Sequence, residues 1–360
     1  MLDMILHPRT IAVLCGGWPT IEFDEKLVRG KKRLIGSPNQ AMRKLHQLFG
    51  EFLVRTIKAT KDDGYGVRKL PSSFGCVPGS NPMNNANEHA KGQWCFYITD
   101  LFDAYGHVSM ERLALLVTFL LRYDDYADEV SLGWFGLDDR AECLKRDWAY
   151  APTLSFLQAH FAGQYGKGLA IGGPLSPYLM NLYCEVFVDM PLRKLCERRG
   201  ITYTRYVDDL VFSAKQFIGR ETRARIRAII ERGGFSVNHK KSWVRLHSMG
   251  QASVTKWGIE RQGSDGRILR ITYPQRKRRL LHGIIHSYLT KQMDWPEKVS
   301  GYVAEFLHYY KQAERRGMLT ATDHKTMELC RQFKTEWDKY GGPKYQLGRR
   351  YQEKLRSRKR

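Results

Sequence analysis

The strongest chemical signal in the sequence is the Tyr-Val-Asp-Asp segment at residues 206–209, which has apolar, strand-forming residues on both sides. This pattern predicts a β-hairpin with Asp208 and Asp209 at its turn. Two adjacent carboxylates repel each other, and a bound cation relieves the repulsion. Asp100 ends a separate apolar strand predicted at residues 94–100, which could pair beside the hairpin. Three carboxylates brought together in this way can hold two Mg²⁺ ions for in-line phosphoryl or nucleotidyl transfer.

A simpler interpretation of the paired aspartates is a solvated turn, because aspartate is a frequent turn residue. The composition bears on this choice. The 360 residues include 59 lysines and arginines against 37 aspartates and glutamates, which gives a net charge of +22. Such a surplus indicates a polyanionic partner, nucleic acid first and an acidic membrane surface second. The hydrophobic content of 42% excludes a disordered basic tail.

Helices and strands predicted around the carboxylates would have to position them. Ser109 is the predicted N-cap of an apolar helix. Helices are predicted at 45–54, 112–122, 175–197 and 220–231, strands at 201–212 and 235–244, a hairpin at 254–259 and 267–272, and basic helices from 275 onward. Residues 71–93 are rich in Gly, Pro, Ser and Asn and predict a loop, whereas the acidic residues at 124–147 predict a solvated insertion.

The order and spacing of the motifs resemble those of reverse transcriptases. Residues 206–209 resemble their catalytic signature, and Asp-Leu-Phe-Asp-Ala-Tyr at 100–105 resembles their first catalytic motif. The resemblance implies an α+β right-hand polymerase fold with fingers, a palm of antiparallel sheet and helices, and a helical thumb. It also implies an RNA-directed DNA polymerase whose Asp100, Asp208 and Asp209, together with Leu101, hold two Mg²⁺ ions.

Further motifs resemble nucleotide-binding parts of the same family. Residues 171–177 are similar to its Gly-rich loop, with Ile171 where Gln is common. Tyr105 would be the steric gate that favours deoxynucleotides, or else an ordinary half-buried tyrosine. Lys241, within Asn-His-Lys-Lys-Ser at 238–242, would protonate the leaving pyrophosphate, or else be a surface lysine. The resemblance implies dNTP contacts by Arg33, Asp103, Ala104, Tyr105, Gly172 and Ser176.

Asn-Ala-Asn-Glu-His at residues 85–89 looks like the Asn-Ala-x-x-His signature of the retron branch. At 254–256 the chain has Val-Thr-Lys where a retron thumb carries Val-Thr-Gly, so a defence-associated or group II intron-like relative is an alternative. His89 would contact RNA or be structural, and the basic residues after Pro274 would follow a phosphate backbone or face solvent. The predicted RNA contacts are Asn85, His89, Arg276, Lys277, Arg278 and Arg279.

The resemblance divides the chain into a fingers and N-terminal segment (1–93), a palm with inserted fingers elements (94–260), a helical thumb (261–340) and a basic tail (341–360). With no room for a ribonuclease H domain and no Cys/His cluster for an endonuclease, we expect a bare polymerase. Its setting would be a retron-like element that makes RNA-linked single-stranded DNA in antiviral defence. The expected partners are a non-coding RNA template and primer, its DNA product, dNTPs and a separate effector protein.

Two other functions fit the same motifs: template-independent or protein-primed synthesis, and RNA binding by a polymerase scaffold without catalysis. The seven cysteines show no Cys-x-x-Cys spacing, which argues against a disulfide framework or a structural zinc site. The longest apolar run, at 113–121, is far shorter than a membrane span. We therefore expect a cytoplasmic protein with reduced cysteines and no membrane partner, whose oligomeric state the sequence leaves open.

Overall fold

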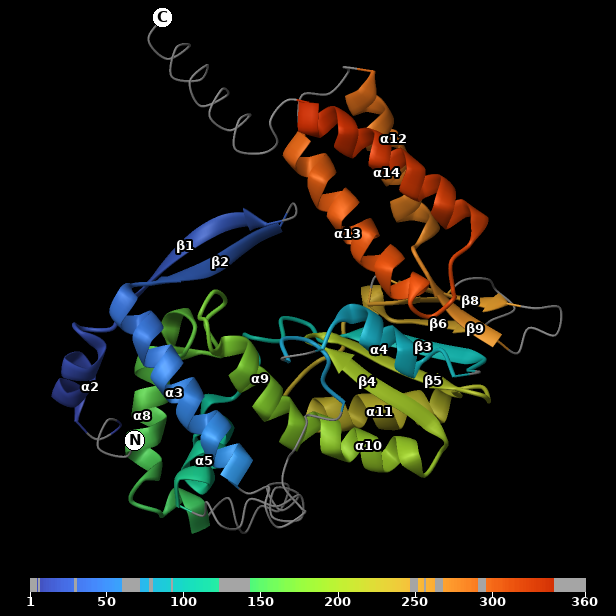
Figure 1. Cartoon of the computed structure of the whole chain (residues 1–360). Helices are drawn as coiled ribbons and strands as arrows, with labels where there is room; N and C mark the ends of the chain where they lie inside the picture. Colours follow the sequence, from blue (N-terminus) through green and yellow to red (C-terminus); the bar gives the residue numbers. More distant parts are fainter. Residues whose placement is uncertain are drawn as a thin grey trace, which may run out of the picture. The chain divides into compact units, whose positions relative to one another are not determined.

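The computed structural model describes residues 5, 7–28, 31–59, 72–77, 80–91, 93–122, 143–246, 252–255, 257–262, 268–290 and 296–339. The chain forms two compact units, residues 1–249 and residues 250–360, which are described separately (Figure 1). Most of the predicted acidic insertion, the tail at 341–360 and Lys256 of the Val-Thr-Lys segment lie outside the described residues. All seven cysteines are free thiols, as expected.

A four-stranded antiparallel sheet in the order β4-β5-β3-β6 lies at the centre of the first unit. Its strands are β3 (Cys95–Asp100), β4 (Ile201–Tyr206), β5 (Asp209–Ala214) and β6 (Trp243–Leu246). In Figure 1 the helix α4 (Pro82–Glu88) lies on one side of the sheet, and α10 (Met190–Glu197) and α11 (Arg220–Arg232) lie on the other. Strands β3 and β5 are buried along nearly their whole length, which explains their continuous apolar runs.

The helix predicted at 175–197 is interrupted in the structure. It consists of α9 (Ser176–Cys184), a π-helical turn η4 (Glu185–Asp189) and α10. Pro191 has no backbone N–H, so the regular bonding pattern cannot continue through it, and the Met190 N–H donates five residues back to Glu185. Such turns are frequent at functional sites, and this one carries the buried Asp189.

An N-terminal hairpin was not predicted from the sequence. It is formed by β1 (Ile21–Val28) and β2 (Lys31–Pro38), and helices α2 (Pro8–Cys15) and α3 (Gln40–Ala59) flank it. Most of β1 is exposed, so its side chains lack the apolar alternation that reveals a half-buried strand. Helix α3 contains the predicted 45–54 and is longer at both ends.

Two predicted segments differ from the structure. Residues 71–93 are not all loop, because α4 forms within them, begun by Pro82 and by the Asn81 side chain, which accepts from two backbone N–H groups. The strand predicted at 235–244 begins only at Trp243, after a 3₁₀ turn η5 (His239–Lys241). Helix α5 (Met110–Arg122) does begin after Ser109, whose Oγ accepts the Arg112 N–H at 3.2 Å.

Two further helical elements in the described part of the first unit are α8 (Tyr150–His160) and the 3₁₀ turn η3 (Gln164–Gly166).

Among the described residues of the second unit, a sheet in the order β7-β8-β9 accompanies three helices. The elements are β7 (Ala252–Val254), β8 (Trp257–Gln262), β9 (Ile268–Thr272), α12 (Gln275–Leu289), α13 (Pro296–Glu314) and α14 (Ala321–Lys339). Trp257, Tyr273, Phe306 and Tyr309 form its aromatic core. The predicted hairpin corresponds to β8 and β9. Within the described ranges, no helix is both long enough and apolar enough to cross a bilayer.

The Gly-rich loop is tied to the N-terminal hairpin. The Gly36 N–H donates to the Ile171 carbonyl at 2.6 Å, and a Cβ on Gly172 would lie 2.3 Å from the Gly36 carbonyl oxygen. Gly172 also has a φ of +103°, which side-chain-bearing residues rarely adopt. Only glycine therefore allows this loop to approach β2 closely.

Replacing Gly172 by serine should destabilise the first unit through both the overlap and the backbone strain. We expect a loss of about 2–4 kcal/mol in the free energy of unfolding, measured by denaturant titration. Gly219→Ser is the matched control, because its added Cβ would meet nothing within 4 Å and serine is a good N-cap for α11. Equal stability of the two variants would contradict the assigned packing.

Candidate active site

Strand pairing brings the three predicted carboxylates together. In the β3–β5 register, Asp100 is the direct partner of Asp209, and the Leu101 N–H donates to the Asp208 carbonyl at 2.9 Å. One carboxylate oxygen from each of Asp100, Asp208 and Asp209 lies within 4.8 Å of the others. Asp100 is 4% exposed, and the other two are half-buried. The pairing of β3 with β5 therefore brings the three carboxylates together, which the separate motifs alone could not establish.

The donor set fits a hard divalent cation. All three groups are carboxylates, and oxygen ligands are those that Mg²⁺ prefers over sulfur or imidazole. Within the described part of the chain, this is the one cluster of three or more acidic, histidine or cysteine side chains close enough to share an ion. Asp100, Asp208 and Asp209 are thus the residues that would hold a metal.

Burial and the close packing of like charges raise the pKa of both turn residues, Asp208 and Asp209. Burial first, and then the charges of Asp208 and Asp100, raise the pKa of Asp209 to about 7. Burial and the charge of Asp100 also raise the pKa of Asp208, while the positive charges of Lys241 and Arg33 oppose that rise. The carboxylates are therefore costly to ionise together without a cation.

Lys241 supplies part of the compensating charge. Its Nζ lies 2.8 Å from each carboxylate oxygen of Asp100, and Asn238 Nδ2 donates to Asp100 Oδ2 at 3.1 Å. Burial opposes the charge on Lys241, but the hydrogen bond to Asp100 and the neighbouring carboxylates raise its pKa overall. The ammonium group is thus kept protonated beside the cluster. Asn238 had no role in the sequence-based prediction, although it lies in the same motif.

The turn that carries Asp208 and Asp209 is strained. Tyr206 pairs with Asp209, so Val207 and Asp208 form a two-residue loop, and Val207 has a φ of +60°. A positive φ at the first loop position is usual for glycine and unfavourable for a β-branched residue. Backbone strain of this kind costs about 1–3 kcal/mol and persists only where the surroundings enforce it.

Two predicted nucleotide contacts lie near the carboxylates. Tyr105 is half-buried, and burial together with the negative charge of Asp208 raises its pKa, so its hydroxyl stays neutral. Arg33 on β2 is exposed, and its charge acts on Asp208. Both residues therefore remain candidates for the binding of a nucleotide.

The other predicted nucleotide contacts are placed differently. Asp103 is exposed with a φ of +42°, and Gly172 lies in the tight approach to β2. The side chains of Ala104 and Ser176 are 6% and 1% exposed. Burial of these two side chains argues against their contacting a nucleotide.

The Asn85 and His89 side chains are fully buried, which contradicts their prediction as RNA contacts. The ring nitrogens of His89 lie 2.6 Å from Ser213 Oγ and 2.7 Å from Thr204 Oγ1. Burial lowers the pKa of His89 to about 3, so the ring is neutral. The structural alternative for His89 is the one that the fold supports: it joins α4 to strands β4 and β5.

The four predicted basic contacts of α12 divide into two pairs. Arg276 and Arg279 are exposed, whereas Lys277 forms an ion pair with Glu305, and Arg278 forms one with Asp323 at 2.6 Å. Lys277 and Arg278 thus hold the second unit together, and their availability for RNA is less than the sequence implied.

A buried charge pair beneath the turn was missed. Arg205 and Asp189 form an ion pair in which both side chains are 0% exposed. Part of the signal was present, because Arg205 is the one charged residue of the strand at 201–206 and a buried charge needs a partner. Asp189 gave no such signal, because the helix predicted at 175–197 holds five charged residues. Periodicity did not reveal which residue that partner would be.

The site and the sheet that builds it match a known family. Residues 24–281 match the reverse transcriptase (RNA-dependent DNA polymerase) family, and this chain belongs to it. Membership confirms the α+β right-hand polymerase fold that the motifs predicted, and Figure 1 shows the mixture of helices and antiparallel sheets.

Relatives of the retron type are among the similar proteins. The chain is 32% identical over 168 residues to the retron Mx162 reverse transcriptase of Myxococcus xanthus, covering 42% of this chain and 34% of the relative. It is 38% identical over 82 residues to the retron Ec86 reverse transcriptase of Escherichia coli, covering 22% and 25%. The predicted resemblance to retron-type enzymes is thereby confirmed, although each match spans well under half of the relative's length.

Among solved structures, the apo telomerase of Candida tropicalis is similar with a TM-score of 0.45 and 14% identity, over 75% of this chain and 52% of that one. The same telomerase in complex with a TWJ fragment of telomeric RNA gives a TM-score of 0.44 at 14% identity, over 82% and 54%.

Divalent cations should stabilise the protein more at higher pH. The folded state holds a proton on Asp209 up to about pH 7, whereas the unfolded chain releases it near the ordinary value of 3.8. Ionising this group therefore lowers the stability of the metal-free protein as the pH rises between those values, and a bound cation removes that penalty.

We expect MgCl₂ to raise the melting temperature clearly at pH 8 and only slightly at pH 6, measured by calorimetry. In Asp209→Asn, the metal-free stability should lose the part of its pH dependence that this carboxyl causes. An identical effect of MgCl₂ at both pH values in the unmodified protein would contradict the assignment of Asp209.

Proposed function

We propose that the chain is an RNA-directed DNA polymerase that adds deoxynucleotides to a primer on a structured RNA template. One observation carries the proposal: the register of β3 and β5 gathers Asp100, Asp208 and Asp209 at one edge of the palm sheet. Three carboxylates so close together fit two Mg²⁺ ions, the arrangement used for in-line nucleotidyl transfer. A scaffold that only bound RNA would not need this electrostatically costly cluster.

The surrounding residues have separate tasks in this proposal. Bound Mg²⁺ supplies Lewis-acid chemistry, which lowers the pKa of a primer 3′-hydroxyl and stabilises a leaving pyrophosphate. Lys241 keeps its proton beside the cluster and can donate it to the pyrophosphate. Arg33 presents its positive charge toward the triphosphate, and the Tyr105 ring excludes a ribose 2′-hydroxyl. Leu101, next to Asp100, would contribute to metal binding.

The biological setting is a finer part of the proposal. Similarity to retron reverse transcriptases supports a retron-like element that makes RNA-linked single-stranded DNA in antiviral defence. Its partners would be a non-coding RNA, the DNA product, dNTPs and a separate effector protein, in the cytoplasm. Exposed Arg276 and Arg279 would contact the RNA phosphates from a thumb at 261–340, with fingers at 1–93, a palm at 94–260 and a basic tail at 341–360.

Removing one carboxylate tests the catalytic assignment. Purified Asp208→Asn should extend a primer on an RNA template more slowly than the unmodified chain, by a factor on the order of 10² to 10³. Its thermal stability should not fall, because one of three repelling charges is gone. Glu231→Gln, an exposed acid-to-amide change on α11, is the control and should extend normally.

Full extension by Asp208→Asn would refute the metal assignment. If the unmodified chain incorporates dNTPs without any template, the template-independent alternative replaces the proposal. If it binds RNA tightly but incorporates nothing, the non-catalytic alternative does.

Truncating Tyr105 tests the selection of the sugar. Tyr105→Ala should incorporate ribonucleotides better relative to deoxynucleotides, by about tenfold or more, because the ring no longer fills the space of a 2′-hydroxyl. Tyr105→Phe keeps the ring and should keep the discrimination. Competition assays with matched rNTP and dNTP pairs measure the ratio, and an unchanged ratio in Tyr105→Ala would remove the gate role.

A further inference from the structure

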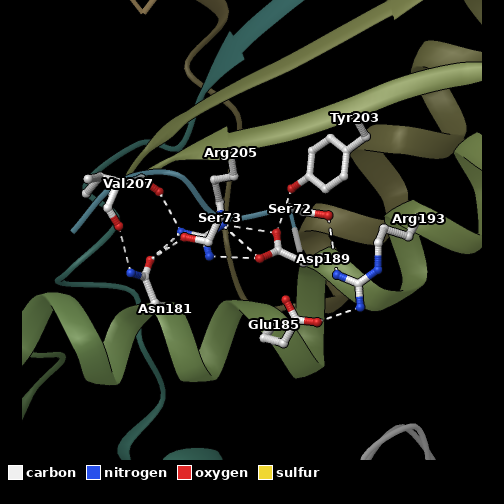
Figure 2. A network of polar contacts seen from close by, with 10 residues as sticks. Ser72, Ser73, Asn181, Glu185, Asp189, Arg193, Tyr203, Arg205 and Val207 are labelled. Atoms are coloured by element: carbon white, nitrogen blue, oxygen red, sulfur yellow. Dashed lines mark hydrogen bonds and ion pairs between the residues drawn. The ribbon is translucent and has the colours of Figure 1, made fainter. Parts of the chain in front are cut away.

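A buried polar network lies directly beneath the turn that carries Asp208 and Asp209. Figure 2 shows Arg205 of β4 at its centre, with Asp189 of the interrupted helix on one side, and Asn181 of the same helix and Val207 of the turn on the other. The Arg205 and Asp189 side chains are 0% exposed, and Asn181 is 2% exposed. Burial of two charges is unfavourable unless each is neutralised and fully hydrogen-bonded. The hydrogen bonds that Arg205 and Asp189 make therefore decide whether the network is stable.

The Arg205 guanidinium reaches all three partners at once. Its Nε and Nη2 donate to the Asp189 carboxylate at 2.8 to 3.1 Å, and its Nη1 donates to Asn181 Oδ1 at 2.9 Å. The same Nη1 donates to the Val207 carbonyl at 3.0 Å. A planar fork with several donors can make these contacts together, whereas a lysine ammonium on a flexible stem cannot.

The contact with Val207 falls where the turn most needs support. Val207 has the unfavourable φ of +60°, and the next residue is Asp208. Gly75 also packs closely against this turn, since a Cβ there would lie 2.6 Å from the Val207 nitrogen. Asn181 links Gly75 to the network, because its Nδ2 donates to the Gly75 carbonyl at 2.8 Å. Both Arg205 and Gly75 therefore contact Val207.

The backbone of Arg205 is fixed as well. Its N–H donates to the Ser72 carbonyl at 2.6 Å, and its carbonyl accepts the Phe74 N–H at 2.8 Å. Tyr203 donates its hydroxyl to Asp189 Oδ1 at 2.6 Å, so it supports the network through Asp189. The backbone of Arg205 is thus held by residues 72–74, and the carboxylate of Asp189 is held by Tyr203.

We propose that Arg205, held by Asp189 and Asn181, is a positioning residue that fixes the 206–209 turn and thereby sets the affinity of Asp208 and Asp209 for divalent metal. The two carboxylates repel each other and Asp100, so a loosely held turn would relax away from the metal-binding arrangement. A turn held in advance does not need to reorganise when a cation binds, and this raises the affinity. The inference deepens the proposed polymerase function and rests on its metal site.

A purely structural role for the ion pair makes a different prediction. Apolar side chains of similar volume often replace a buried ion pair without loss of stability. Such a replacement cannot donate a hydrogen bond to the Val207 carbonyl. The double variant Arg205→Met/Asp189→Leu should therefore keep its fold but bind metal more weakly. If the ion pair were purely structural, this variant would keep its metal affinity as well.

The test measures Mn²⁺ binding to the full chain by electron paramagnetic resonance, alongside thermal unfolding. We expect the double variant to unfold near the temperature of the unmodified protein and to bind Mn²⁺ at the carboxylates about 10–100-fold more weakly, as for other residues that orient metal ligands. Asp208→Asn identifies the signal of this site by removing it. Tyr203→Phe is the matched control, which loses one bond to Asp189 and should keep its Mn²⁺ affinity within about twofold.

Unchanged Mn²⁺ affinity in a folded double variant would overturn the proposal. If that variant does not fold, Arg205→Lys decides: it keeps the charge opposite Asp189 but not the fork, so it should fold and still bind Mn²⁺ more weakly, and normal binding would again overturn the proposal. Binding needs no nucleotide incorporation. A wild-type chain that binds Mn²⁺ but never extends a primer would therefore refute the polymerase function and leave the positioning role intact.

Discussion

The carboxylates of Asp100, Asp208 and Asp209, whose oxygens lie within 4.8 Å of one another, repel each other. Contacts from several segments of the first unit hold them together against that repulsion. The strand register fixes Asp100 opposite Asp209, so the cluster cannot separate without breaking the sheet. Lys241 and Asn238 reach Asp100 from the segment before β6 and offset part of its charge. Burial, and then the charges of Asp208 and Asp100, still raise the pKa of Asp209 to about 7. A divalent cation is the natural counterpart of such a cluster.

The same constraint explains the unusual features next to the cluster. Val207 holds an unfavourable backbone conformation, and the helix behind it widens into a π-helical turn at Glu185–Asp189. The two are connected, because this turn carries Asp189, whose carboxylate fixes Arg205, and Arg205 in turn holds the Val207 carbonyl. Unfavourable backbone geometry thus occurs at positions where the surrounding packing stabilises it, which is expected near functional sites.

Net charge gives an incomplete picture of where a polyanion can bind. The surplus of +22 counts every lysine and arginine equally. In the structure, Arg205, Lys277 and Arg278 form ion pairs inside their units, whereas Arg276 and Arg279 remain exposed. Only exposed cations can exchange their counterions for phosphates, so the surface available to nucleic acid is smaller than the composition suggests.

The sequence by itself determined the central hairpin, the strand ending at Asp100, most helices and the reverse transcriptase family, because apolar periodicity and motif spacing are local properties. It did not determine the exposed hairpin β1–β2, which lacks an apolar face, or α4, whose polar residues resemble a loop. Tertiary structure alone decided that His89 is buried, that Lys241 binds Asp100, and that Arg205 supports the turn. His89 and Ser213 are 124 residues apart, and Lys241 and Asp100 are 141 apart, so no local pattern encodes these pairings. Val207 is only two residues from Arg205, but Asp189 and Asn181, which hold the guanidinium, come from a different element.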